Sequence, residues 1–165
     1  MGVHGLMLKK LLILLTILIL FTGCVLPKSY TDYVPNEQQY WQTIMKLDTP
    51  FKIAFYMENN FEYNMHLYSS AKTPYQFWID GYGDCKDYAA FGDFAARYHG
   101  YKAYILQIFF KNSNISHLLG IYKEGDLYSF TDCWVYSSGF KTIDDCVSWY
   151  IFYSGYELLK YMVIG

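Results

Sequence analysis

Residues 81–89 read Gly-Tyr-Gly-Asp-Cys-Lys-Asp-Tyr-Ala, which places a cysteine directly after a glycine-containing loop. Aspartate is a preferred capping residue at helix amino termini, so Asp84 predicts a helix that begins at Cys85. The predicted helix runs to His99, where Gly100 ends it. The sequence therefore puts a thiol at the first position of a helix.

The predicted helix carries one narrow face of small side chains. Cys85, Ala89, Gly92 and Ala96 follow one another at spacings of four, three and four residues. Such spacings bring side chains onto one side of a helix. Because these side chains are small, we expect the helix to lie very close to a flat surface, and a sheet is the natural candidate.

Strand-like sequence follows this helix. The segments 102–110, 117–122 and 127–130 are rich in aromatic and branched residues, and residues 123–126 supply the glycine and aspartate of a tight turn between the last two. Upstream, we expect amphipathic helices over 36–47 and 51–60; downstream, a helix starts near Thr142, and 156–164 fits a strand or a short helix. The predicted fold class is α+β, a helix with an amino-terminal cysteine packed on a small antiparallel sheet.

Three residues of this region have the chemistry of a cysteine nucleophile and its supporting groups. A thiol attacks a carbonyl as thiolate, and a helix amino terminus favours negative charge. His117 begins a predicted strand and Asp132 ends the next one, so a hairpin would bring them side by side. The sequence thus predicts Cys85 as nucleophile, His117 as its base and Asp132 as the group that orients the imidazole.

Residues 83–89, 117–122 and 127–132 together resemble the transglutaminase-like superfamily, in particular its small bacterial cysteine-peptidase-like members with a papain-like core. The resemblance covers about residues 74–134. It implies the same roles for Cys85, His117 and Asp132, a peptide or protein substrate and no cofactor. If water is the acyl acceptor, the protein is a peptidase or amidase; if an amine is the acceptor, it is a transglutaminase. We favour hydrolysis for so small a domain.

The sequence departs from this family pattern at two points. Leu118 stands where a small residue is common, and the side chain that completes the oxyanion hole has two candidates, Trp78 and Tyr82. A catalytically silent relative that binds envelope peptides or proteins is therefore the alternative. A weaker alternative is a cell-wall hydrolase of the NlpC/P60 type, because the residues after Cys85 do not match the pattern of that family.

The amino-terminal segment has the features of a secretory signal. Lys9 and Lys10 precede an apolar run over 11–21, and small residues lead to Cys24. We expect residues 1–24 to form a signal with lipidation of Cys24, or an uncleaved anchor helix in which Cys24 is incidental. Residues 25–35 would be the tether and 36–165 the domain, held outside the cytoplasmic membrane.

Composition and residue spacing narrow the kinds of partner and site that this chain could have. The chain has 165 residues, a net charge of −2 and 21% aromatic residues, and it lacks the basic stripe that nucleic-acid binding requires. No Cys or His pair stands at ligand spacing, so we do not expect a zinc site. Cys133 and Cys146 would be either a disulfide or two buried thiols.

Overall fold

The computed structural model describes residues 37–66 and 70–164 of the 165-residue chain. The predicted signal segment 1–24, the tether 25–35 and Cys24 lie outside these residues. Within the described ranges, no helix combines the length and the apolar character that crossing a bilayer requires. The attachment to a membrane stays a prediction.

A five-stranded antiparallel sheet forms the centre of the fold, with the strand order β6-β5-β4-β3-β7. Its strands are β3 (Lys102–Phe110), β4 (Ser116–Glu124), β5 (Leu127–Asp132), β6 (Val135–Phe140) and β7 (Leu158–Ile164). A separate parallel pair joins β1 (Glu62–Tyr63) to β2 (Tyr82–Gly83). The fold is α+β, as the sequence predicted.

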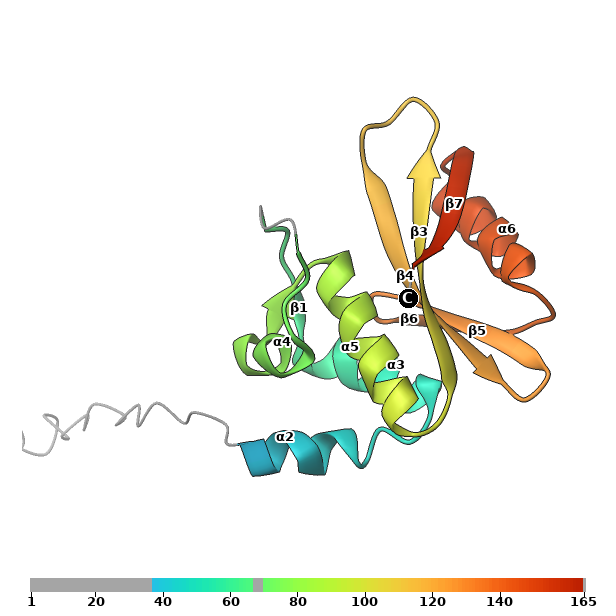
Figure 1. The fold of residues 1–165 in the computed structure, drawn as a ribbon. Helices are drawn as coiled ribbons and strands as arrows, with labels where there is room; N and C mark the ends of the chain where they lie inside the picture. Colours follow the sequence, from blue (N-terminus) through green and yellow to red (C-terminus); the bar gives the residue numbers. More distant parts are fainter. Residues whose placement is uncertain (1–36, 67–69, 165) are drawn as a thin grey trace, which may run out of the picture. The chain divides into compact units, whose positions relative to one another are not determined.

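Helices cover both faces of this sheet. They are α2 (Glu37–Ile44), α3 (Pro50–Asn60), α4 (Pro74–Asp80), α5 (Cys85–Tyr98) and α6 (Ile143–Ser154). Figure 1 shows α2 to α5 on one side of the sheet and α6 on the other, beside β7. The amino terminus of α5 reaches the sheet where β4 begins and β5 ends.

Side chains along each strand point alternately to the two faces of the sheet, so the hydrophobic core has two parts. Tyr122 and Ala103 face α5 and join a cluster that is rich in aromatic rings, with Phe77, Tyr88 and Phe91. Leu119 and Ile121 face α6 and pack with Phe130, Cys146 and Val147. Each face of the sheet is therefore covered by its own hydrophobic cluster.

The small face of α5 lies directly on the sheet, as predicted. Ala89, Gly92 and Ala96 are buried. A side chain at Gly92 would collide with the hydroxyl of Tyr122, which is itself hydrogen-bonded to Thr131 Oγ1 at 2.9 Å. The missing Cβ of Gly92 lets this buried hydroxyl pair sit beneath the helix.

Several expected boundaries change in the structure. The helix predicted over 36–47 ends at Ile44, and the ambiguous segment 156–164 is the edge strand β7. Strand β6 was not predicted. It pairs with β5 through a two-residue connection at Cys133 and Trp134, where Cys133 has a φ of 51° and neither residue is a typical turn former.

We predict that Gly92→Ala destabilises the protein by about 1–3 kcal/mol, because the Tyr122 hydroxyl has to move. Replacing a glycine inside a helix by alanine would otherwise stabilise it by up to about 1 kcal/mol. The measurement is the free energy of unfolding in urea. In a Tyr122→Phe background, which removes the colliding hydroxyl, the loss caused by Gly92→Ala should shrink; an equal loss in both backgrounds would contradict the packing described.

Candidate active site

The amino terminus of α5 is fixed by a capping box. Asp84 is the N-cap residue, and its carboxylate accepts a hydrogen bond from the Lys86 backbone N–H at 3.1 Å. The Lys86 ammonium group also contacts this carboxylate. In return, the Asp87 carboxylate accepts the Asp84 backbone N–H at 2.9 Å. Cys85, the first helical residue, is therefore held in a defined position.

Asp87 joins this cap to the segment that precedes α4. Its side chain is fully buried and also accepts hydrogen bonds from the Lys72 backbone N–H at 2.7 Å and from His66 Nε2 at 2.6 Å. Burial raises the pKa of Asp87, but these hydrogen bonds outweigh it and lower the pKa overall. The stability that this carboxylate contributes is present above its unfolded pKa and is lost as the pH falls.

His117 and Asp132 meet at the edge of the sheet, as the hairpin spacing predicted. His117 Nε2 lies 2.6 Å from Asp132 Oδ1. Both side chains are mostly buried, with 18% and 22% of their surface exposed. Because Nε2 is engaged by the carboxylate, Nδ1 is the ring nitrogen that remains for a second partner.

Tyr150 supports the other side of the imidazole. This tyrosine belongs to α6, and its ring stacks on the His117 ring with centroids 5.7 Å apart and an angle of 3° between planes. Tyr150 is buried. The sequence reading missed it, because nothing in the spacing of α6 links residue 150 to the hairpin.

Cys85 lies beside His117, close enough for its sulfur to raise the pKa of the imidazole. Burial by itself lowers the pKa of His117, but the hydrogen bond to Asp132 and the interaction with Cys85, together with the charges of both partners, raise it to about 9. Cys85 is half-buried. The structure therefore brings the three residues singled out in the sequence together.

The other two cysteines of the described chain are buried free thiols. Cys133 packs in the cluster beneath α5 and Cys146 in the cluster beneath α6, so the disulfide considered between them is not present in this structure. Burial raises the pKa of both thiols, that of Cys146 to about 12. Cys85 differs from both in being more exposed, whereas the buried Cys133 sulfur lies within 4.8 Å of ligand atoms of His117 and Asp132.

The two side chains considered for the oxyanion hole are engaged elsewhere. The indole N–H of Trp78 is donated to the Tyr56 hydroxyl at 2.8 Å. The Tyr82 ring lies under the Lys72 ammonium group, 3.9 Å from its centroid. Within the described part of the chain, neither side chain is hydrogen-bonded to Cys85, and no pattern in the sequence points to a third candidate.

Two clusters contain groups that are able to bind metals. His117, Asp132 and Cys133 form one, and His66, Asp84 and Asp87 form the other, with ligand atoms within 4.8 Å of one another in each. In the second cluster, the carboxylates already accept the hydrogen bonds and the ammonium group of the helix cap. These are the contacts of a helix cap. We assign no metal to either cluster.

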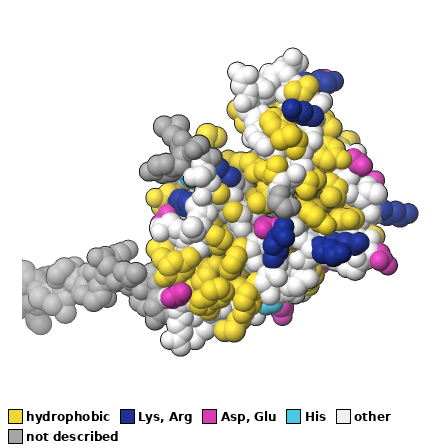
Figure 2. Space-filling view, viewed as in Figure 1, with side chains coloured by type: hydrophobic (Ala, Val, Ile, Leu, Met, Phe, Trp, Pro, Cys, Tyr) yellow, Lys and Arg dark blue, Asp and Glu magenta, His cyan; other side chains and the backbone are white. Residues whose placement is uncertain are grey.

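The surface carries many exposed aromatic and aliphatic side chains, among them Phe51, Phe55 and Trp134. Figure 2 shows hydrophobic side chains over much of the viewed face, and the Lys and Arg side chains there form no continuous stripe. A hollow of about 300 Å³ is lined by Phe51, Phe55, Glu58, Trp134 and Tyr136 among others. One of its lining residues, Trp134, stands two residues after Asp132 in the chain.

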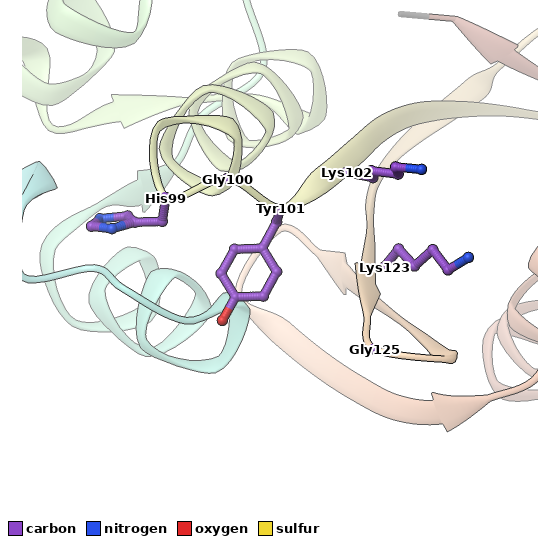
Figure 3. A pocket seen from close by; sticks show the side chains of 6 residues that line it. All are labelled: His99, Gly100, Tyr101, Lys102, Lys123 and Gly125. Atoms are coloured by element: carbon purple, nitrogen blue, oxygen red, sulfur yellow. The ribbon is translucent and has the colours of Figure 1, made fainter.

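A second hollow, of about 430 Å³, lies at the far end of α5. Figure 3 shows its lining residues, His99 to Lys102 with Lys123 and Gly125. Helix α5 has 14 residues and so spans about 20 Å. This hollow is therefore remote from Cys85 and takes no part in the candidate site.

We predict that His117 titrates with an apparent pKa of about 9. Because the pKa is raised above the ordinary 6.5, the stability that its charged form contributes is complete below about pH 6.5 and is lost as the pH rises through about 9. The measurement is the pH dependence of the His117 ring signals by NMR. Asp132→Asn and Cys85→Ala should each lower this pKa, and unchanged values in both variants would contradict the contacts described.

Comparison with known proteins returned a distant structural match. No protein-family model and no curated protein sequence matches the chain. Among solved structures, the chain is similar to LapG of Legionella pneumophila, with a TM-score of 0.47 and 20% sequence identity, over 58% of this chain and 61% of that one. The chain thus aligns with less than two thirds of the length of LapG.

Proposed function

We propose that this protein is a thiol-dependent acyltransferase that acts on amide bonds through Cys85, His117 and Asp132. The single observation that carries the proposal is the series of contacts in which Asp132 holds one side of the His117 ring and the Cys85 thiol meets the ring as well. A thiol, an imidazole and a carboxylate in series are the minimal groups for nucleophilic catalysis by cysteine.

In the proposed reaction each group has its own step. The Cys85 proton passes to His117, and the sulfur attacks the carbonyl carbon to give a tetrahedral oxyanion. As the C–N bond breaks, His117 returns the proton to the leaving nitrogen, which leaves a thioester on Cys85. The acceptor, water or an amine, then loses a proton to His117 and attacks the thioester. Its collapse releases the acyl group, and Cys85 regains its proton.

A peptide or protein is the substrate class that fits the surroundings. The hollow that Trp134 helps to line, two residues after Asp132 in the chain, offers the rings of Phe51, Phe55 and Trp134 to an apolar side chain of the substrate. Hydrolysis is the reaction that we favour, with water as the acceptor. The location that follows from the sequence is the outer side of the cytoplasmic membrane, with attachment through residues 1–24 or through a lipid on Cys24.

We predict that Cys85 reacts quickly with iodoacetamide at about pH 6, where an ordinary cysteine is almost entirely protonated. His117→Ala should slow this alkylation by about 10- to 100-fold, because the imidazole no longer takes the proton. The measurement is the rate of alkylation at Cys85, followed by mass spectrometry of its peptide. Cys146 serves as an internal reference, because it is a free thiol buried in the cluster beneath α6.

His99→Ala is the matched control. This histidine lies at the far end of α5, where its Nε2 contacts the Ile44 carbonyl oxygen at 2.8 Å. The control should alkylate at the wild-type rate. If His117→Ala also retains that rate, the thiol is not activated by His117, and the alternative of a catalytically silent domain that binds peptides takes the place of the enzyme.

A further inference from the structure

The backbone N–H of Cys85 has an unexpected side-chain partner. At the start of α5, the Asp84 carbonyl oxygen accepts the N–H groups of Asp87 and Tyr88, and the Asp84 carboxylate accepts that of Lys86. The Cys85 N–H instead faces the hydroxyl of Tyr63, close enough to act on the pKa of that tyrosine and to lower it slightly against the larger effects of burial and nearby charge. This is the N–H group that an oxyanion formed on the Cys85 thioester pathway would need.

The short parallel sheet explains how Tyr63 reaches this position. Tyr63 of β1 stands opposite Gly83 of β2, two residues before Cys85, and the Asn64 N–H donates to the Gly83 carbonyl oxygen at 2.8 Å. The Tyr63 ring packs against Tyr88 and Trp134, with centroids 6.4 and 6.3 Å away. Backbone pairing and ring packing together aim the hydroxyl at the amino terminus of α5.

We propose that Tyr63 is a catalytic residue whose hydroxyl, together with the Cys85 backbone N–H, forms the oxyanion hole. The inference rests on the function proposed above and supplies the donor that Trp78 and Tyr82 do not. When the substrate carbonyl arrives, its oxygen takes the place of the Tyr63 oxygen at the Cys85 N–H. The tyrosine O–H then donates to that oxygen and keeps its proton throughout, so no charge is transferred to the ring.

The electrostatic surroundings keep this hydroxyl a donor. Partial burial, followed by the nearby charges of Cys85, Cys133 and Asp84, raises the pKa of Tyr63 to about 12. The phenol is therefore protonated over the whole range in which the enzyme would work. The ring is 42% exposed, which leaves room for the small shift that lets a carbonyl oxygen enter.

Two reactions of the same sulfur separate this role from a structural one. Alkylation by iodoacetamide occurs at a saturated carbon and forms no oxyanion, whereas acylation by p-nitrophenyl acetate passes through one. We expect Tyr63→Phe to lower the rate of the Cys85 acylation burst by about 100- to 1,000-fold and to leave alkylation unchanged. Phenylalanine keeps the ring contacts to Tyr88 and Trp134, and the alkylation rate reports that the site is intact.

Tyr82→Phe is the matched control. Tyr82 lies on the neighbouring strand, opposite Glu62, with 45% of its surface exposed, and its variant should leave both rates unchanged. Cys85→Ala gives the background acylation to be subtracted. Acylation of Tyr63→Phe at the wild-type rate overturns the inference, and faster acylation does so as well, because it would mean that the hydroxyl blocks the hole. Slow alkylation of the wild type, in contrast, marks the failure of the proposed function itself.

Discussion

Helix α5 lies against β4 through Gly92, and the Tyr122 hydroxyl occupies the space that a side chain there would take. This close approach keeps α5 near β4. The thiol of Cys85 then arrives at the edge where β4 begins and β5 ends, next to His117. A bulkier contact surface would lift the helix and separate the sulfur from the imidazole.

The site is built from two sides of the sheet. The ring cluster beneath α5 supports Cys85, while Tyr150 of α6 stacks on His117 from the other layer. Asp132 links the two, because it ends β5 directly before the turn at Cys133. Neither helix layer alone would hold a thiol, an imidazole and a carboxylate in series, so the candidate chemistry depends on the complete domain.

Local signals in the sequence predicted a large part of this arrangement. Asp84 as cap, the small face of α5, strand β3 and the hairpin of β4 and β5 each follow from neighbouring residues, and so did the grouping of Cys85, His117 and Asp132. Strand β6 was missed, because the turn at Cys133 uses a positive φ without glycine or asparagine. The roles of three residues were not predicted, those of Tyr63, His66 and Tyr150. Contacts with residues far away in the chain position these side chains, and the residues next to them in the sequence do not indicate such contacts.

The central claim is that the Cys85 sulfur, the His117 ring and the Asp132 carboxylate lie in series. The most direct test is a crystal structure of the protein, in which the distance from Cys85 Sγ to His117 Nδ1 is measured. Our account predicts that this distance is within hydrogen-bonding reach while Nε2 of the same ring contacts Asp132. A ring that points away from the sulfur, or a sulfur sealed in the core, would contradict it.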